Sequence, residues 1–305
     1  MARIAFVFAG QGAQAPGMGR SLAEASPAAA EVFRRVDALR PGTSAQCFEG
    51  TQEELMDTVN TQPCLWAVEL AAAAALTEAG VQAEAAAGFS LGELAALRYA
   101  NAVDFETGFT LVCRRAELMA AAANGTPSFM AAVLKLDAAA VEHVCEAFDK
   151  VWPVNYNCPG QVAVAGEAAA QEAFAQAVRE AGGRARMLKV SGAFHSPLMA
   201  AAAEGFGPAL AGAALHAPRC TLYSNCTGLP YTEGEMKALL QRQICSPVRW
   251  QSEVEHMVRS GIDTFVELGP GKTLCGLIAR IAPEARTLHV EDAASLAETK
   301  EALSC

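Results

Sequence analysis

The sequence has no long apolar run, no clustered cysteines and no leader pattern, and each absence excludes a class of protein. No stretch of 18 apolar residues occurs, so a membrane-spanning helix is not expected. The first residues lack a signal-peptide cleavage pattern. The 10 cysteines are scattered, without a C-x-x-C pair or a histidine at zinc spacing. We therefore expect a cytoplasmic protein with reduced cysteines and no metal site.

Positive charge is scarce as well. Lys and Arg number 23 against 33 Asp and Glu, which gives a net charge of −10, and no basic run occurs. Binding of nucleic acid or of an anionic membrane through a broad electrostatic patch is therefore not expected. Hydrophobic residues make up 52% of the 305 residues. That length and composition suit one large domain, or a large domain with a smaller one inserted.

The pattern of strands and helices predicts an α/β fold. An apolar strand at residues 3–9 is followed by a glycine loop, and helices alternate with strands as far as residue 123. Residues 126–191 then read β-α-β-β-α-β, the ferredoxin-like plan. We therefore expect a large hydrolase-like subdomain with a parallel sheet, built from residues 1–125 and 192–305, and a small inserted subdomain at residues 126–191. The pair Gln62-Pro63 is expected to open a long alanine-rich helix, and a helix at 272–281 is the last element expected.

The stretch Gly88-Phe89-Ser90-Leu91-Gly92 has the G-x-S-x-G pattern of a nucleophile elbow. An apolar run precedes it and a helix-like stretch follows it. The glycines allow a tight strand-to-helix turn that leaves the serine hydroxyl at its tip. The start of the helix directs free N–H groups and its positive dipole end at a developing oxyanion. Because G-x-S-x-G alone also occurs in ordinary turns, the other parts of a site must be found elsewhere in the chain.

A nucleophilic serine needs a base, and histidine is the usual choice at neutral pH. The chain has five histidines. His195 is the candidate that we favour, because it lies in a Gly/Ser/Pro-rich connector between the two expected subdomains, where clefts form. The other four, on helices, in a loop and near the C-terminus, remain alternatives on the residues alone.

Two stretches imitate nucleotide-binding loops. Gly10-x-Gly12-x-x-Ala15 follows a strand as a dinucleotide fingerprint would, but the next acidic residue at suitable spacing, Asp37, lies within a helix. Gly271-Lys272-Thr273 resembles the end of a P-loop, but Val266 stands where the first glycine is required. No nucleotide cofactor is therefore expected.

Several ordered motifs resemble those of the malonyl-CoA:acyl-carrier-protein transacylases, a family that includes the acyltransferase domains of polyketide synthases. The motifs run in order along the chain from Phe6 to about Ile281. They are Gly10-Gln11-Gly12-Ala13-Gln14, Gly88-Phe89-Ser90-Leu91-Gly92-Glu93, Cys113-Arg114-Arg115-Ala116-Glu117-Leu118-Met119, Gly192-Ala193-Phe194-His195 and Gly269-Pro270-Gly271-Lys272. The resemblance implies transfer of malonyl from malonyl-CoA to acyl carrier protein in fatty acid synthesis, with no cofactor.

The resemblance also implies ping-pong chemistry through a Ser90–His195 dyad. Ser90 would carry the malonyl ester, and the phosphopantetheine thiol of the carrier would then attack that ester. The backbone N–H groups of Gln11 and Leu91 would form the oxyanion hole. In this family a main-chain carbonyl orients the histidine, and the matching residue here is Gln243.

Substrate selection is assigned through the same resemblance. Arg115 would hold the malonyl carboxylate with its planar guanidinium, whereas Arg114 fits an exposed helix position. Phe194 matches a position that is aromatic in malonyl-selective relatives, where a ring would crowd a 2-methyl branch. Phe89 departs from the family, because relatives commonly carry histidine before the serine.

The carrier protein is acidic, so docking requires local positive charge near the cleft. Arg184, Arg186 and Lys189 are the candidates, although a scattered solvated face would look the same in the sequence. We expect a monomer. Two alternatives stay open: a free-standing enzyme that loads a polyketide carrier, and a serine thioesterase or hydrolase with the same elbow. A free-standing chain of this length favours the fatty acid carrier.

Overall fold

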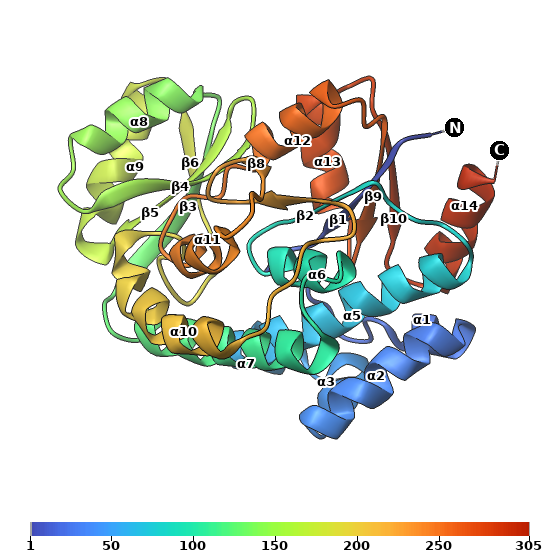
Figure 1. Cartoon of the computed structure of the whole chain (residues 1–305). Coiled ribbons are helices and arrows are strands. Elements are labelled where there is room, and N and C mark those ends of the chain that lie inside the picture. Colours follow the sequence, from blue (N-terminus) through green and yellow to red (C-terminus); the bar gives the residue numbers. More distant parts are fainter. Residues whose placement is uncertain (1, 305) are drawn as a thin grey trace.

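The computed structural model describes residues 2–304, which form two β-sheets with helices around them (Figure 1). The strands of the larger sheet are β1 (Ile4–Phe8), β2 (Ala85–Gly88), β7 (Thr221–Ser224), β8 (Leu229–Pro230), β9 (Thr264–Leu268) and β10 (Arg286–Val290). The strands of the smaller sheet are β3 (Ser128–Leu134), β4 (Val151–Cys158), β5 (Gln161–Glu167) and β6 (Arg184–Met187).

Helices make up most of the remaining chain. Those before the smaller sheet are α1 (Arg20–Ala25), α2 (Pro27–Leu39), α3 (Thr43–Glu49), α4 (Gln52–Met56), α5 (Thr58–Glu78), α6 (Gly92–Tyr99) and α7 (Phe105–Ala123). Those within or after it are α8 (Ala138–Glu146), α9 (Gln171–Glu180), α10 (Ala200–Gly212), α11 (Met236–Gln243), α12 (Trp250–Arg259), α13 (Thr273–Ile281) and α14 (Ala293–Leu303). Two short 3₁₀ turns cover Ala168–Ala170 and Pro197–Met199.

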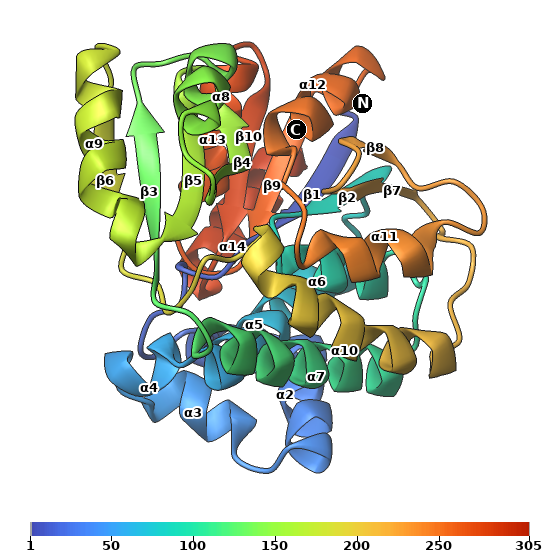
Figure 2. The ribbon, with the colours of Figure 1, turned by 90° about the vertical axis from the view of Figure 1, so that its left-hand side faces the viewer.

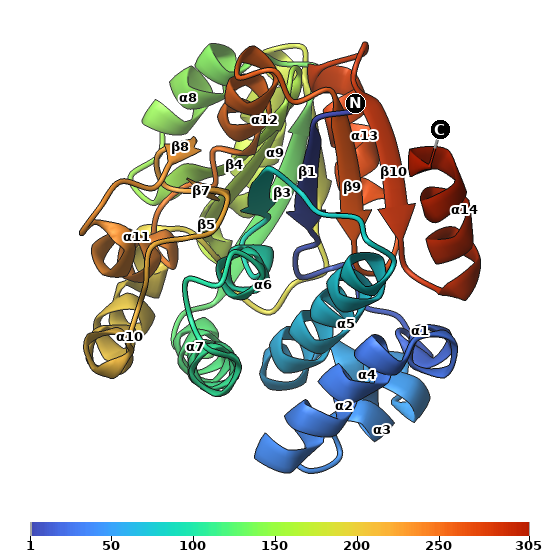
Figure 3. The same ribbon diagram turned by 45° about the vertical axis from the view of Figure 1, so that its right-hand side comes forward.

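The larger sheet has the strand order β10-β9-β1-β2-β7-β8, and all of its pairings are parallel except that of β7 with β8. Side chains of β1 alternate between its two faces. Phe6 and Phe8 pack into the core that contains α5 and α6, whereas Ala5 and Val7 pack toward α12 and α13. Figure 3 shows this sheet with α14 beside its β10 edge. The expected α/β fold is therefore confirmed, and the sheet expected to be parallel is parallel except at the edge strand β8.

The smaller sheet is antiparallel, with the order β4-β5-β3-β6. Its elements follow each other as β-α-β-β-α-β. One face packs against α8 and α9, where Phe174 and Val178 meet Phe129 and Val133 in a separate core (Figure 2). The other face joins the main core through residues such as Met130. The division of the chain at residues 126 and 191 stays a prediction.

Two expectations about helix ends were wrong. The alanine-rich helix α5 begins at Thr58, not at Gln62-Pro63, because the Asp57 carboxylate accepts the Val59 N–H and caps the helix there. Pro63 lies inside the helix. Contrary to expectation, the helix that ends at residue 281 is also not the last element of the fold. Strand β10 and helix α14 follow, the latter started by a capping box at Asp292.

Among residues 2–304, no helix is both long and apolar enough to cross a membrane. Helix α5 has 21 residues and is rich in alanine, and it lies in the core, where it packs against α2 and α7.

Candidate active site

Ser90 lies at a sharp turn between strand β2 and helix α6, as the G-x-S-x-G pattern predicts. Its φ of 55° falls in the left-handed region, which a non-glycine residue adopts only under structural constraint. The turn is tight because a Cβ on Gly88 would lie 1.9 Å from the carbonyl carbon of Gly92. Only a glycine lets strand and helix approach so closely. The strained turn presents the Ser90 side chain at the carboxyl end of the sheet.

His195 lies next to Ser90 although 105 residues separate them in the chain. The Ser90 hydroxyl is 2.6 Å from Nε2 of His195. Nδ1 of the same ring lies 2.9 Å from the main-chain carbonyl oxygen of Gln243. A carbonyl only accepts hydrogen bonds, so Nδ1 carries the proton and Nε2 is left to accept from the serine. The three groups therefore stand in the order nucleophile, base and orienting group.

Arg115 is a buried cation in direct contact with the nucleophile. Its Nη2 donates to the Ser90 hydroxyl over 3.2 Å and to Oε1 of Gln243 over 2.9 Å, and its Nη1 donates to Oε1 of Gln62 over 2.8 Å. The side chain is 1% exposed. These three partners are neutral, and among residues 2–304 no carboxylate forms an ion pair with the guanidinium. Its neighbour Arg114 is exposed and donates to Glu117, as expected.

Gln243 connects the main parts of the site through both its main chain and its side chain. Its carbonyl oxygen accepts from His195, and its Oε1 accepts from Arg115. Its Nε2 donates to the Ser90 carbonyl oxygen over 2.6 Å and to Oε2 of Glu93 over 2.9 Å. A single residue at the end of α11 therefore fixes the positions of base, cation and elbow relative to one another.

Asn225, which directly follows strand β7, holds the backbone of the elbow through hydrogen bonds of its side chain. Its Oδ1 accepts the Ser90 N–H over 2.8 Å, and its Nδ2 donates to the Gly88 carbonyl over 2.7 Å and to Oε1 of Glu253 over 2.9 Å. Asn225 and Glu253 are fully buried. The bonds to Ser90 and Gly88 hold the backbone at the nucleophile and just before it in the strained turn.

The two amides expected to form the oxyanion hole both lie beside the elbow. Within residues 2–304, no group accepts a hydrogen bond from the N–H of Gln11 or from that of Leu91. The Gln11 loop is pressed onto the elbow, because a Cβ on Gly10 would lie 2.9 Å from the Phe89 carbonyl oxygen. Leu91 is the N-cap residue of α6, where amides are free of helical partners. Two free donors near a nucleophilic serine suit the stabilisation of a developing negative charge.

Comparison with known proteins shows the family to which the chain belongs. Residues 5–298 match the family model described as an acyl transferase domain. The chain belongs to the acyl transferase domain family. The resemblance seen in the ordered sequence motifs is thereby confirmed.

Named relatives of this acyl transferase share about a third of its residues. It is 37% identical over 299 residues to the malonyl CoA-acyl carrier protein transacylase of Bacillus subtilis (strain 168), covering 96% of this chain and 94% of the relative. The solved malonyl CoA-acyl carrier protein transacylase of Clostridium perfringens superposes with a TM-score of 0.96 at 35% identity, over 99% and 98% of the two chains. A malonyl-transacylase solved in complex with a type II polyketide acyl-carrier protein gives 0.94 at 35% identity, over 99% and 100%.

The ionisable groups of this acyl transferase are shifted by burial. The pKa of His195 is lowered to about 4, mainly by burial and secondly by the nearby charge of Arg115. The imidazole is therefore neutral at pH 7 and can accept a proton. Burial lowers the pKa of Arg115 to about 10, which leaves it charged at pH 7. Burial raises the pKa of Glu93 to about 7, opposed by hydrogen bonds that include those of Tyr231, Asn225 and Gln243.

A cavity of about 250 Å³ lies between the two sheets and meets the site at Gln11 and Phe89. Strands β4 and β5 of the smaller sheet line its far wall with Asn155, Asn157 and Gln161. The Oδ1 atoms of both asparagines are buried, and no described residue donates a hydrogen bond to either. A second hollow, of about 380 Å³, is lined by Gln11 with residues that include Lys189, Ser191 and Met56.

Phe89 and Phe194 are placed differently from each other. The Phe89 ring packs edge-to-face on Trp250, with centroids 5.8 Å apart, and also lines the cavity between the sheets. An apolar ring at this position is therefore accommodated by an aromatic neighbour. Phe194 is 7% exposed and belongs to the main core, directly before His195 in the chain.

The remaining predicted residues lie outside this group. Arg184, Arg186 and Lys189 are exposed at the edge of the smaller sheet or just after it. Among residues 2–304, no group of three or more His, Cys, Asp or Glu side chains is placed to hold a metal ion.

The sequence alone gave no role to several residues that the structure brings into the site. Gln62, Asn225 and Glu253 lie outside the motifs, and their neutral or acidic side chains have no distinctive pattern. Glu93 lies inside the elbow motif, but the motif itself indicates no role for its side chain.

Proposed function

We propose that this acyl transferase moves the malonyl group from malonyl-CoA to the phosphopantetheine thiol of an acyl carrier protein, for fatty acid synthesis. The observation that carries the proposal is the buried guanidinium of Arg115, 3.2 Å from the Ser90 hydroxyl and without a carboxylate partner. An acyl group on Ser90 that ends in a carboxylate supplies that partner. The acyl groups of ordinary esters are uncharged, so they would leave such a cation beside the nucleophile without an anion.

The first half-reaction loads the serine. Ser90 Oγ attacks the malonyl thioester carbonyl while its proton passes to Nε2 of His195. The negative charge on the carbonyl oxygen is stabilised by the N–H groups of Gln11 and Leu91. The tetrahedral intermediate then collapses, the C–S bond breaks, and the imidazolium returns the proton to the CoA thiolate. The products are free CoA and a malonyl ester on Ser90.

The second half-reaction reverses these roles with a different thiol. The carrier's phosphopantetheine thiol gives its proton to His195 and attacks the ester carbonyl, and the Ser90–acyl bond breaks with return of the proton to Oγ. The Gln243 carbonyl orients the imidazole through Nδ1–H without adding a negative charge. A carboxylate in that position would repel the malonyl carboxylate in the same buried site.

Selection among acyl groups follows from the same contacts. Malonyl pairs with Arg115 through charge-assisted hydrogen bonds, whereas acetyl leaves the guanidinium without an anion. Phe194, which precedes the base, is proposed to crowd a 2-methyl branch. Steric selection against methylmalonyl is then on the order of 1–3 kcal/mol.

The pantetheine arm is proposed to enter through the cavity between the sheets. Pantetheine carries two amide N–H donors, and the buried Oδ1 atoms of Asn155 and Asn157 have no donor of their own. An unmet buried acceptor is costly, so both asparagines favour a ligand with N–H groups. This route requires two units that face each other, and we propose residues 1–125 with 192–305 as the large unit and 126–191 as the small one.

The proposal includes a partner protein, the acyl carrier protein, and a location in the cytoplasm. The acidic carrier docks near the exposed Arg184, Arg186 and Lys189, of which Lys189 lines the hollow next to Gln11. The enzyme acts as a cytoplasmic monomer and needs no cofactor, because serine, histidine and arginine supply the chemistry. A polyketide carrier is the second candidate acceptor, supported by the similar transacylase solved with such a carrier.

The test supplies malonyl-CoA with one of two holo carriers, from fatty acid or type II polyketide synthesis, and follows carrier mass and free malonate. We expect malonyl-carrier to form, faster with the fatty acid carrier, and little free malonate without a carrier. Faster loading of the polyketide carrier would reassign the acceptor. Rapid release of malonate without any carrier would make the protein a hydrolase instead.

A further inference from the structure

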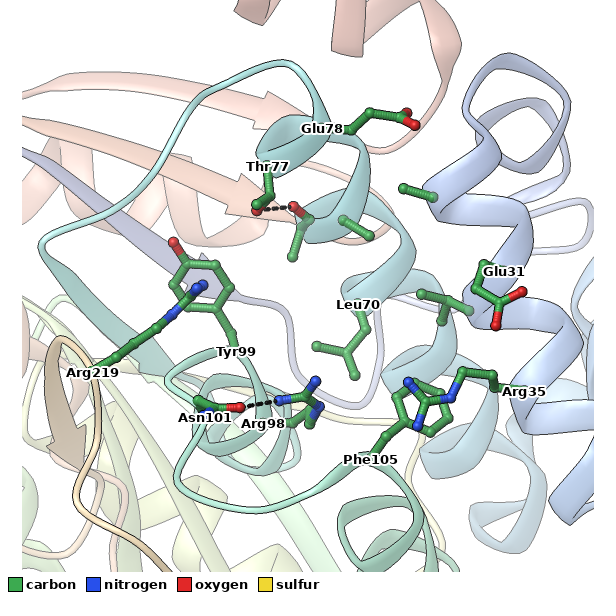
Figure 4. A pocket seen from close by; sticks show the side chains of 14 residues that line it. Glu31, Arg35, Leu70, Thr77, Glu78, Arg98, Tyr99, Asn101, Phe105 and Arg219 are labelled. Carbon is green, nitrogen blue, oxygen red and sulfur yellow. Dashed lines mark hydrogen bonds between the residues drawn. The ribbon is translucent and has the colours of Figure 1, made fainter.

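A further pocket lies at the opposite end of helix α6 from the nucleophile. It has a volume of about 460 Å³ and is formed by α2, α5, the end of α6, the start of α7 and the segment before β7 (Figure 4). Ser90 precedes the first residue of α6, and the pocket is lined by Arg98 and Tyr99 at its last turn. An 8-residue helix is roughly 12 Å long, so the pocket is separate from the site described above.

Three arginines from three different segments line this pocket. They are Arg35 of α2, Arg98 of α6 and Arg219, which precedes β7. Figure 4 shows Arg98 between the other two. Three guanidiniums therefore gather around one hollow of a chain whose net charge is −10.

Only one of these arginines has its charge compensated by an ion pair. Arg35 pairs with Glu106. Arg98 donates to the neutral Oδ1 of Asn101 over 3.0 Å. Within residues 2–304, no carboxylate lies within ion-pair distance of Arg98 or Arg219.

The carboxylates that line the pocket have other partners. Glu31 pairs with Arg34 on its own helix, and Glu78 accepts a hydrogen bond from the Ser26 hydroxyl over 2.6 Å. Asp104, beside the pocket, accepts the Thr107 N–H over 2.8 Å as the cap of α7. None of these three carboxylates therefore forms an ion pair with Arg98 or Arg219, although Glu78 and Asp104 keep their negative charges near the pocket.

The flanking guanidiniums are held in place before any ligand arrives. The Arg35 guanidinium lies 3.9 Å from the centre of the Phe105 ring, and that of Arg219 lies 4.5 Å from the centre of the Tyr99 ring. Cation–π stacking of this kind limits side-chain motion. Arg219, which has no ion pair of its own, is thus preorganised and loses less entropy when it binds an anion.

Arg98 is the least favourably placed of the three. Its burial, followed by the charges of Arg35 and Arg219, lowers its pKa, while Asp104 and Glu106 oppose that effect. A position at the last turn of α6 favours one cation through the helix dipole. The dipole of α6 does not account for Arg35 and Arg219, which lie on other segments, or for the pocket that the three arginines line.

The pocket has an apolar floor below these charges. Val32 of α2 and Leu70, Ala73 and Ala74 of α5 line it. Apolar lining with a few convergent polar groups is typical of small-molecule sites, and the volume lies in their usual range. The pocket therefore offers a charged rim and an apolar base to one ligand.

We infer that this pocket binds a small amphipathic anion, with a phosphate or carboxylate headgroup on Arg98 and Arg219 and an apolar chain against Leu70 and Ala74. Guanidiniums bind both headgroups with paired N–H donors. This inference is independent of the function proposed for Ser90, since neither arginine is part of that site.

The test is calorimetric titration of the full chain with four probes: octyl phosphate, octanoate, inorganic phosphate and 1-octanol. We expect one of the two amphipathic anions to bind at least about 10-fold more tightly than inorganic phosphate, and octanol not to bind. The ranking of octyl phosphate against octanoate identifies the headgroup. Equal affinity for octyl phosphate and inorganic phosphate would remove the apolar part of the proposal, and no binding of either amphipathic anion would overturn it.

Three variants localise the binding. Arg98→Gln should weaken the tighter probe by about 10- to 100-fold, the usual effect of losing a charge-assisted hydrogen bond. Ala74→Phe should fill the floor and have a similar effect with every arginine retained. Arg179→Gln, an equal charge change on the distant helix α9, should leave affinity unchanged. Malonyl loading should be unaltered in all three, and wild-type affinity in both Arg98→Gln and Ala74→Phe would overturn the site.

Discussion

Arg115 carries the proposed substrate choice, because it is the buried cation that touches the nucleophile. Arg115→Ala should lower kcat/KM for malonyl loading by about 100-fold or more, through loss of charge-assisted hydrogen bonds. Loading from acetyl-CoA should rise, since no cation is then left unpaired. Arg114→Ala, one residue away and exposed, is the matched control and should change neither rate. Malonyl loading that survives in Arg115→Ala would refute the carboxylate contact.

The pH dependence of loading depends on His195. Its pKa is lowered from 6.5 to about 4, so the base stays neutral until the pH falls close to 4. The rate at low malonyl-CoA concentration should thus hold through pH 6.5 and decline with an apparent pKa near 4. With acetyl-CoA as donor, Arg115→Gln should move the decline to higher pH, because the positive charge that disfavours the imidazolium is gone. A wild-type decline centred at 6.5 would contradict the buried, neutral base.

Glu69 provides a test of stability at the residue scale. It is fully buried in α5, and no described residue hydrogen-bonds either carboxyl oxygen. Burial raises its pKa well above 4.5. Above pH 4.5 the carboxyl ionises in the unfolded chain but not in the folded one, so the wild type loses stability as the pH rises.

Glu69→Met should therefore increase the free energy of unfolding at pH 7 by about 1–3 kcal/mol. The gain should shrink as the pH falls toward 4.5. Denaturant unfolding at several pH values measures both effects, with Glu24→Met, an exposed glutamate, as the control. A pH-independent change, or a loss of stability at pH 7, would show that the carboxyl has a partner in solution.

At the scale of elements, the elbow depends on β7 as much as on its own strand and helix. Asn225→Ala should lower the loading rate by about 10- to 100-fold, because the Ser90 N–H, the Gly88 carbonyl and the Glu253 carboxyl all lose a buried partner. Thr227→Ala, in the same turn, removes only bonds with Leu229 and serves as the control. Equal rates in the two variants would mean that the elbow holds its shape without Asn225.

The elements of the site differ in how far the sequence could predict them. The G-x-S-x-G turn was predictable because its geometry requires glycines at fixed spacing. His195 could be favoured over the other four histidines because it lies in a Gly/Ser/Pro-rich connector between the two expected subdomains. Asn225 and Gln62 could not be predicted, because their roles depend on strand β7 and helix α5 being brought beside the elbow by tertiary packing. The N-terminus of α5 was misjudged for a related reason, since the Asp57 cap outweighed the proline signal.

At the scale of the whole molecule, the alternation of strands and helices was enough to predict the parallel sheet and the β-α-β-β-α-β segment. Strand β10 and helix α14 were missed, because short half-buried segments such as Arg286–Val290 lack a strong apolar period. The cavity between the sheets was also beyond sequence reasoning. Its lining comes from both sheets and from the loop after β1, and only the packed structure brings these together.

Docking of the carrier is a property of the whole surface. Replacing Arg184, Arg186 and Lys189 together by Glu should raise KM for the carrier by about 10-fold or more and leave malonyl loading unchanged, because only the carrier step uses this charge. The control replaces Arg259, Arg286 and Lys300, which are exposed elsewhere, by Glu. The same rise in both triple variants would indicate net charge alone, and no rise in either would remove the patch.

In the proposed mechanism, Ser90 carries the malonyl group between two thiols. The most direct measurement is the intact mass of the protein after brief mixing with malonyl-CoA in the absence of carrier. The wild type should gain the mass of one malonyl group and lose it when holo carrier is added, and Ser90→Ala should gain nothing. An adduct that persists in Ser90→Ala, or a wild type that transfers malonyl without ever carrying it, would contradict the account.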